Sequence, residues 1–221
     1  MSKKSIEKEF NICKKSLIHN RLVIAVKNTD ETLIAFLKPI CFTFREDMPE
    51  IPILMSKWRI ENPTISAGMF KVTEERTISW LDSLVLQVDD RIIFMIESYD
   101  GVYLGHLGFT NYDESRNTID LDSVLRGVKG MYPGLMSLSV VALMAWGFEK
   151  LNIDNIELEV LSDNITAIKF YENIGFETSK TTRLIKVIKE DEEKYEVAKN
   201  QLASSNDKYY LRMVYTNKGI I

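Results

Sequence analysis

A strand-like pattern, a glycine-containing loop and an apolar run follow one another between residues 118 and 148. Residues 118–125 alternate between apolar and polar side chains, which is the period of a half-buried strand. Residues 126–133 contain two glycines, a proline and two cations, and the run at 134–148 is uncharged. This order predicts a strand, a basic loop and a buried helix that begins after Pro133.

The basic loop has the composition of a phosphate site. The first turn of a helix carries unpaired N–H groups and the positive end of the helix dipole. Gly127 and Gly130 would let the backbone approach a ligand closely, and Arg126 and Lys129 add positive charge. A strand-to-helix turn that binds nothing explains the same residues, and a glycine-rich loop alone does not decide between these two interpretations.

Further elements follow from the same periodicities. Strands are expected at about 22–26, 32–44, 91–97, 102–110, 156–161, 182–188 and 209–215, and helices at 52–59, 74–87 and 165–174. Pro39 should divide 32–44 into two short strands or confine it to a sheet edge. Residues 1–20 are expected to form a helix or loop at the edge, and the charged stretch 189–200 a solvated face.

Turn and cap residues join these elements. Asp100-Gly101 favours a tight turn, so the three strands between residues 91 and 125 are expected to form an antiparallel meander. Thr73 and Asn164 suit helix N-caps, and Gly175 suits the end of a helix.

Composition narrows the class of protein. The chain has 221 residues, of which 45% are hydrophobic and 27% charged, as in an ordinary globular protein, and no repeat divides it. A formal net charge of −4 gives no overall attraction to nucleic acid or an anionic membrane. Cys13 and Cys41 occur without a CxxC or Cys/His pattern, so we expect reduced, structural thiols and no metal site.

Targeting signals are missing from the pattern. The first ten residues carry charges but no apolar segment of the kind that a signal peptide needs. The apolar run at 134–148 has 15 residues, which is too short to span a bilayer. We therefore expect a cytoplasmic protein without a membrane partner.

A more specific motif lies in the C-terminal half. Asn-x-x-Ala-x-x-x-Tyr-x-x-x-Gly-Phe runs from Asn164 to Phe176. With the order of elements before it, this string resembles the GNAT superfamily of acyl-CoA-dependent N-acetyltransferases, over roughly residues 40–180 and a last strand near 209–215. The resemblance implies an α/β (α+β) fold, with a mixed, mostly antiparallel central sheet and helices on both faces. Residues 1–221 are then one domain, with 1–39 as an N-terminal extension.

The resemblance also implies where acetyl-CoA would bind. The family's phosphate loop, Arg/Gln-x-x-Gly-x-Gly/Ala, falls on residues 131–136, and only Gly134 matches it. Met131 stands in place of the Arg or Gln, and Met136 in place of the small residue. The expected cofactor-binding residues are Val124, Leu125, Arg126, Lys129, Gly130, Met131, Gly134, Met136 and Asn164, with no metal ion.

Acetyl transfer to an amine needs a neutral amine, a stabilised carbonyl oxygen and a way to accommodate the leaving thiolate. The family implies direct attack, without an enzyme nucleophile. Tyr171 matches the family's general acid, although a tyrosine there could also simply pack its ring in the core. A backbone N–H near Val124 to Arg126 would meet the oxyanion.

The general base stays open. Asp122 and His106 are the main candidates, because Asp120 and Asp122 lie two residues apart and close carboxylates raise each other's pKa, and because histidine titrates near neutral pH. Glu97 is a further candidate, and a water chain could replace all of them. Each of these residues could also have a structural role or lie in solvent without a catalytic role.

The acceptor is the least defined part. Trp58-Arg59 at the end of a helix and Gly105-His106 in a strand look similar to acetyltransferases of nucleotide-linked amino sugars. Trp58, Arg59 and Trp80 could bind such an acceptor by stacking and phosphate pairing. Helix-end packing and a surface ion pair explain them equally well.

The expected function is acetyl-CoA-dependent transfer of an acetyl group to a primary amine on a small molecule, with a nucleotide-linked amino sugar as one candidate. A protein N-terminus or lysine, and a non-catalytic acyl-CoA-binding interaction module, are the alternatives. A dinucleotide-binding fold ranks last, because the loop lacks Gly-x-Gly-x-x-Gly. A homodimer stays open, and no nucleic acid is expected as a partner.

Overall fold

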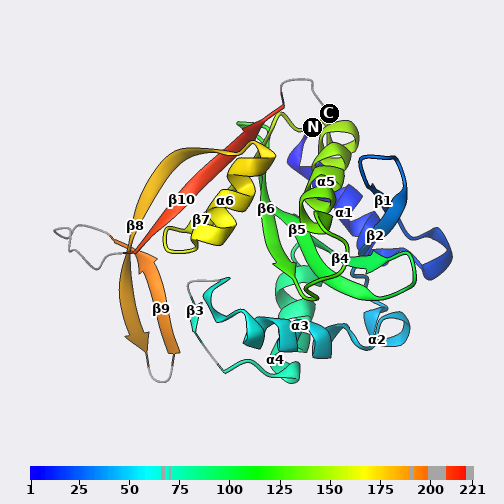
Figure 1. Ribbon diagram of the computed structural model, residues 1–221, viewed down its shortest axis with the longest axis horizontal. Helices are drawn as coiled ribbons and strands as arrows, with labels where there is room; N and C mark the ends of the chain where they lie inside the picture. The colour runs from blue at the N-terminus through cyan, green and yellow to red at the C-terminus, as the bar shows by residue number, and fades with distance from the viewer. Residues whose placement is uncertain (66–67, 70, 190–191, 199–207, 218–221) are drawn as a thin grey trace.

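The computed structural model describes residues 1–65, 68–69, 71–189, 192–198 and 208–217. The described strands form one ten-stranded sheet in the order β1-β2-β4-β5-β6-β7-β10-β8-β9-β3 (Figure 1). The strands are β1 (Ile24–Lys27), β2 (Leu33–Pro39), β3 (Gly68–Met69), β4 (Ile92–Ser98), β5 (Tyr103–Asp113), β6 (Thr118–Arg126), β7 (Asn155–Leu161), β8 (Glu177–Lys189), β9 (Glu192–Val197) and β10 (Lys208–Thr216). Neighbouring strands run antiparallel except β6 and β7, which run parallel.

Helices cover both faces of this sheet, as expected (Figure 1). They are α1 (Lys3–Lys15), α2 (Phe44–Asp47), α3 (Ile51–Glu61), α4 (Glu74–Trp80), α5 (Leu135–Leu151) and α6 (Ile165–Ile174). Two three-residue 3-10 turns, η1 (Ile18–Asn20) and η2 (Pro63–Ile65), and a π-helical segment, η3 (Leu81–Leu86), complete the set. Residues of α1, α5 and α6 pack on one face in a core that contains Phe94 and Phe109. Residues of α2, α3 and η3 pack on the other face against Ile93 and Met95. The alternation of β4 side chains therefore divides the core into two layers.

The N-terminal helix is part of the core, so the expectation of an edge element was wrong. Ile6 and Phe10 of α1 are fully buried, and the Phe10 ring stacks on Trp146 of α5 with centroids 6.3 Å apart. These two residues are four apart and therefore share one face of the helix. The many lysines of α1 concealed this narrow apolar stripe, and one of them, Lys14, is itself buried and donates to the Val88 carbonyl at 2.8 Å.

Residues 32–44 form one strand instead of two, and that strand is not at an edge. β2 lies between β1 and β4 and ends at Pro39, which is paired with Phe94. Proline has no N–H to continue the ladder, so the chain leaves the sheet there. Because β1 covers the outer side of β2, the edge on this side of the sheet is β1.

The remaining helices and turns largely follow the sequence patterns. Thr73 caps α4, since its side chain accepts a hydrogen bond from the Arg76 N–H at 3.2 Å. The expected helix at 74–87 changes to π-helical geometry over η3. The meander β4–β5–β6 is confirmed, and Gly101 takes the positive φ of 84° that its turn needs.

The charged stretch 189–200 contains β9, which pairs with β8 and with β3, so it extends the sheet. Residues 190–191 and 199–200 of this stretch lie outside the described residues. No helix among the described residues is long and apolar enough to cross a membrane.

Candidate active site

An opening in the sheet between β6 and β7 is the main feature of the site. The two parallel strands are joined at three register positions, Thr118–Asn155, Ile119–Ile156 and Asp120–Glu157. Both strands continue, to Arg126 and to Leu161, but no further position joins them among the described residues. Beyond Asp120 the facing backbone N–H and C=O groups therefore have no strand partner, and an extended ligand could take that place.

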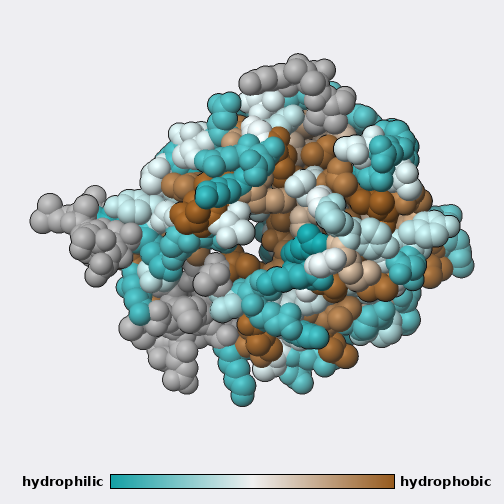
Figure 2. Space-filling model, in the orientation of Figure 1, coloured by the Kyte–Doolittle hydropathy of each residue, from teal (hydrophilic) through white to brown (hydrophobic). Residues whose placement is uncertain are grey.

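Figure 2 shows the molecule hollowed at this place, between α6, β6 and the layer formed by α3 and α4. The hollow lies beside the diverging ends of β6 and β7 in Figure 1. The resemblance placed the reaction at this end of the 118–125 strand, and the geometry supplies the space for it.

A bulge bends β6 at the mouth of the opening. Gly108 pairs with Asp122 and His106 pairs with Leu125, so two residues of β6 lie opposite the single residue Leu107. Ser123, the first of the two, has a φ of +52°. A bulge of this kind turns the strand and redirects its side chains.

His106 stabilises the bulge. Its Nδ1 donates to the backbone carbonyl of Ser123 at 2.6 Å, and its ring stacks on Trp58 with centroids 6.2 Å apart. The carbonyl can only accept, so Nδ1 carries the proton and Nε2 has a lone pair. Burial lowers the pKa of His106 to about 4, so the ring is neutral at neutral pH.

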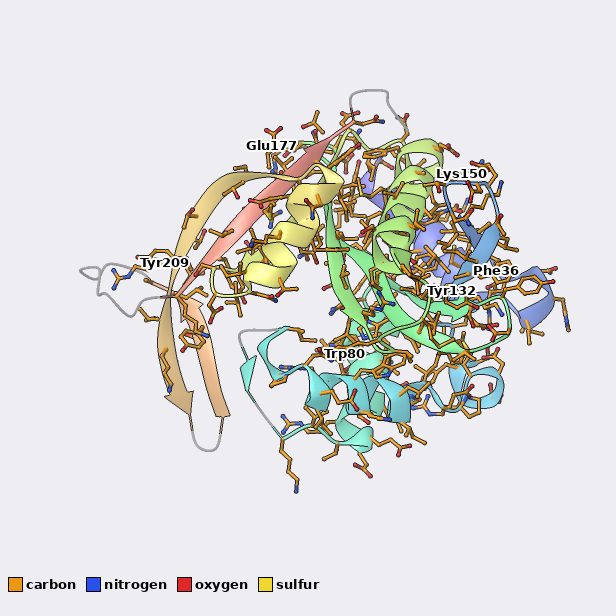
Figure 3. The ribbon with its side chains drawn as sticks, viewed as in Figure 1. Phe36, Trp80, Tyr132, Lys150, Glu177 and Tyr209 are labelled. Atoms are coloured by element: carbon orange, nitrogen blue, oxygen red, sulfur yellow. The ribbon has the colours of Figure 1, made fainter. Side chains whose placement is uncertain are left out.

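Asp122 is held by an arginine that the sequence did not single out. An Arg91 Nη2 lies 2.6 Å from an Asp122 carboxylate oxygen, and the Arg91 guanidinium lies over the Trp80 ring at 5.1 Å. Arg91 directly precedes β4, and Asp122 lies on β6, so the ion pair links two strands that both pair with β5. Figure 3 shows Trp80 between the helical layer and the sheet. No local pattern in the sequence indicates this contact, because it depends on how the strands are ordered in the sheet.

Tyr171 lies on α6 and is buried, with its ring packed edge-on against Phe170 and Phe176. Burial raises the pKa of the Tyr171 phenol, and the negative charge of Asp122 raises it further. The phenol is therefore protonated at neutral pH. The charge of Asp122 also acts on the pKa of His106, which it raises against the larger effect of burial.

Asp120 and Asp122 do not act as a coupled pair, contrary to the expectation from their spacing. Asp120 binds Arg212 at 2.6 Å and Asn111 at 3.2 Å, whereas Asp122 binds Arg91. Burial raises the pKa of Asp120, and the carboxylates that raise it further are Glu157 and Glu159 of β7. Each aspartate thus has its own arginine.

Glu97, the further candidate base, is engaged elsewhere. Its carboxylate pairs with Lys38 at 2.6 Å. It lies on β4 opposite Phe36 of β2, at the other side of the sheet from β7. The structure does not bring it to the opening.

The loop between β6 and α5 is organised by Arg126 itself. Its Nε donates to the Val128 carbonyl at 3.0 Å and an Nη donates to the Met131 carbonyl. Gly130 and Gly134 have φ of +84° and +77°. The Leu135 N–H donates to the Tyr132 carbonyl at 3.1 Å, but no described side chain caps the first turn of α5. The N–H groups of Met136 and Ser137 can therefore meet an anion, as the expected phosphate site requires.

The other residues expected at the cofactor differ in how far their side chains are exposed. Lys129 and Gly130 are exposed in the loop, and Val124 and Met131 are half-buried beside the core. The side chains of Leu125 and Met136 are buried, so these two positions can offer only backbone groups to a ligand. Asn164 caps α6, accepting from the Ala167 N–H at 3.2 Å.

The first two residues expected at the acceptor are occupied within the fold. Trp58 is 2% exposed, and a Cβ added to Gly127 would come within 2.0 Å of its ring. Arg59 donates to the carbonyls of Asn62 and Pro63 at the end of α3. Trp80 remains half-buried under Arg91. Among the described residues, no group of three or more His, Cys, Asp or Glu side chains is arranged to hold a metal ion.

Comparison with known proteins places this chain in a family. A family model described as an acetyltransferase (GNAT) domain matches residues 43–177, more than half of the chain. A probable GNAT-family acetyltransferase from Chromobacterium violaceum superposes with a TM-score of 0.60 at 18% identity, over 90% of this chain and 93% of that one. No curated protein sequence matches the chain.

Two further solved structures share the fold. RimL, a ribosomal L7/L12 alpha-N-protein acetyltransferase in complex with coenzyme A, gives a TM-score of 0.62 at 13% identity, over 88% of this chain and 98% of its own. Apo FdhC, described as a nucleotide-linked sugar GNAT, gives 0.59 at 12% identity, over 89% and 92%. At these identities the likeness concerns the fold alone.

The fold and the site define an acyltransferase that draws its acyl group from a coenzyme A thioester. The match to the family model shows that the chain belongs to the GNAT acetyltransferase family. The resemblance to the GNAT superfamily is thereby confirmed, and so is the expected fold class, a mixed, mostly antiparallel sheet with helices on both faces.

Proposed function

We propose that this protein transfers an acetyl group from acetyl-CoA to a primary amine by direct attack. The observation that carries the proposal is the bulge of β6 beside the opening, where Asp122 and His106 lie and where the charge of Asp122 acts on the Tyr171 phenol. At neutral pH the raised pKa keeps Tyr171 protonated and the lowered pKa keeps His106 neutral, so the first can donate a proton and the second can accept one.

The chain's own groups fit the donor. The unpaired edges of β6 and β7 would hydrogen-bond the amide-containing arm of acetyl-CoA, as an added strand does. The loop 127–134 and the first turn of α5 would hold the pyrophosphate, with Lys129 adding charge from the surface. Acetyl-CoA supplies the activated acyl group as a thioester.

Tyr171 is the general acid in this proposal. A phenol that stays protonated can donate its proton to a thiolate as that thiolate leaves. The edge-on contacts with Phe170 and Phe176 hold the ring in one orientation. A backbone N–H of Val124 to Arg126, next to the bulge, would stabilise the oxygen that gains charge.

Asp122 is the proposed base that receives the amine proton. It lies on the face of the sheet that carries Arg91 and Trp80, where an acceptor can approach through the hollow. Arg91 fixes the orientation of the carboxylate, and Trp80 fixes the guanidinium by a cation–π contact. His106 is the alternative base through Nε2, with Ser123 holding its other nitrogen.

The acceptor is a small primary amine, and a nucleotide-linked amino sugar is our preferred class. The half-buried Trp80 indole, beside the proposed base, offers an aromatic surface on which a base or sugar could stack. The solved structures with this fold include a nucleotide-linked sugar GNAT, an alpha-N-protein acetyltransferase and a spermidine N-acetyltransferase, so these are the acceptor classes to compare.

The test combines calorimetric titration with acetyl-CoA and a thiol-release assay across amine classes. Micromolar binding and thiol release with one amine class would support the proposal. Binding without turnover of any amine would favour a non-catalytic acyl-CoA-binding module. This alternative is suggested by Met131 and Met136, which depart from the family's phosphate-loop consensus. No binding at millimolar acetyl-CoA would refute both.

A further inference from the structure

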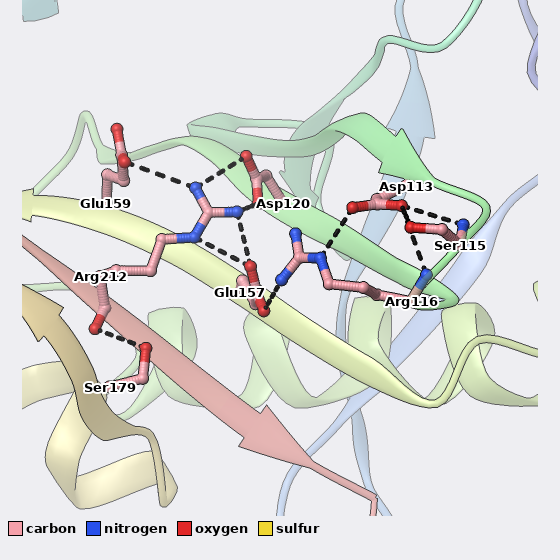
Figure 4. A network of polar contacts seen from close by, with 8 residues as sticks. All are labelled: Asp113, Ser115, Arg116, Asp120, Glu157, Glu159, Ser179 and Arg212. Atoms are coloured by element: carbon pink, nitrogen blue, oxygen red, sulfur yellow. Dashed lines mark hydrogen bonds and ion pairs between the residues drawn. The ribbon is translucent and has the colours of Figure 1, made fainter.

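A half-buried arginine on β10 links three strands at the point where the opening begins. Arg212 pairs in register with Glu159 of β7. From there its side chain crosses β7, contacts Glu157 through two nitrogens at 2.6 and 2.9 Å, and reaches Asp120 of β6 at 2.6 Å (Figure 4). The guanidinium therefore links β6 to β10, although β7 lies between these two strands in the sheet.

The position of this contact is as important as its strength. Asp120–Glu157 is the last register pair between β6 and β7, so Arg212 binds both residues of the final joined position. Only three pairs hold these strands together before they part. The guanidinium cross-link thus lies at the apex of the opening, where a small change in backbone spacing becomes a larger change at the bulge.

The surroundings make the cross-link rigid. The side chains of Asp120 and Glu157 are 14% and 10% exposed, so their charge-assisted hydrogen bonds are little weakened by water. β8 carries one extra residue, Ser179, opposite Arg212, and the Ser179 hydroxyl donates to the Arg212 carbonyl at 3.2 Å. A bulge fixes the direction of the side chain beside it.

A second arginine offers a matched comparison. Arg116, in the turn between β5 and β6, donates to the other oxygen of Glu157 at 2.7 Å and to Asp113 at 2.7 Å (Figure 4). It has a similar contact with the same carboxylate, but among the described residues its side chain pairs with Asp113 and Glu157 and does not reach Asp120. Its side chain is 52% exposed, so it contributes little to holding the strands.

We propose that Arg212 is a positioning residue for the acyl donor. It rests on the proposed function, because the edges of β6 and β7 that it spaces are those that would bind the arm of acetyl-CoA. Arg212 touches neither donor nor acceptor in this role. It sets the width of the opening, and a misplacement of the donor near 1 Å is enough to change catalysis strongly.

The test uses Arg212→Gln and Asp120→Asn, with Arg116→Gln as the control. Asp120→Asn keeps the side-chain shape and leaves the Arg212–Glu157 contacts in place, so it reports on the link to β6 even where Arg212→Gln does not fold. We expect both test variants to raise the Kd and KM for acetyl-CoA about tenfold, with the KM for the amine changed less than twofold. Arg212→Lys should recover part of the affinity, and Arg116→Gln should resemble the wild type.

Hydrogen exchange gives a readout without turnover. Amides of residues 121–125 should exchange faster in Arg212→Gln and Asp120→Asn than in Arg116→Gln. Unchanged acetyl-CoA affinity in both folded test variants, while the wild type binds and turns over, would overturn the positioning role alone. A wild-type protein that does not bind acetyl-CoA would overturn the proposed function as well.

Discussion

The imidazole of His106 donates a hydrogen bond from Nδ1 to the backbone carbonyl of Ser123, 2.6 Å away, where Ser123 has a φ of +52°. This contact stabilises a backbone conformation that non-glycine residues rarely adopt. It also orients the ring, so the same histidine maintains the bulge and presents Nε2 away from it. Because the imidazole is buried, protonating it costs free energy in the folded state, so the stability of the protein depends on pH.

The unfolding free energy should fall as the pH drops from 6.5 toward 4. The folded pKa of His106 is about 4, below its ordinary value of 6.5, so the unfolded chain binds the proton more readily. The stability is fully present above pH 6.5 and decreases by on the order of 3 kcal/mol by pH 4. Urea unfolding across this range measures it.

The chain has two histidines, so the second one, His19, serves as the control. His106→Asn keeps a donor for the Ser123 carbonyl but does not titrate, so it should lose most of this histidine's contribution to the pH slope. His19→Asn, at an exposed position, should keep the wild-type slope. Equal slopes in both variants would show that carboxylates alone cause the acid sensitivity.

Tyr171→Phe should lower kcat about 100-fold and leave acetyl-CoA affinity within twofold of the wild type. The substitution removes the proton donor but keeps the ring that packs on Phe170 and Phe176. Because the pKa of Tyr171 is raised, wild-type kcat should show no loss from its ionisation up to about pH 10. Steady-state kinetics with thiol detection decides, and an unchanged kcat would remove Tyr171 from the mechanism.

Asp122→Asn should lower kcat about 100-fold, since the amide cannot accept the amine proton. Arg91→Gln should change kcat less, because the carboxylate remains but loses the guanidinium that orients it. The exposed pair Arg45–Asp82, on α2 and η3, offers a comparison. Asp82→Asn should keep wild-type kinetics, and similar losses in Asp82→Asn and Asp122→Asn would point to a general effect of lost charge.

Gly127→Ala should destabilise the fold by about 1–3 kcal/mol and weaken acetyl-CoA binding. The new Cβ would come within 2.0 Å of the rigid Trp58 ring, so the loop that follows β6 would have to move. Gly101→Ala, where nothing lies within 4 Å of the new Cβ and only the positive φ opposes it, should cost less and leave binding unchanged. Thermal unfolding and titration calorimetry of both variants test this.

The sequence determined most of the secondary structure and its local caps and turns. Alternation and caps depend on neighbours within a few residues, so Thr73, Gly101 and Asn164 could be assigned from the chain alone. The role of Tyr171 came instead from the resemblance of the motif from Asn164 to Phe176 to the GNAT superfamily, and it stays a prediction, whereas the helix, N-cap and terminal glycine of that motif are as expected.

Only the tertiary structure decided which distant groups meet. The stripe of Ile6 and Phe10 was hidden among lysines until α5 was seen to cover it, and Trp58 proved to be packed on Gly127. The separation of Asp120 from Asp122 depends on Arg212 and Arg91, which lie on other strands. Spacing along a chain fixes which side of an element a residue faces, whereas its charge partner and its burial depend on the register between strands, which one local pattern does not encode.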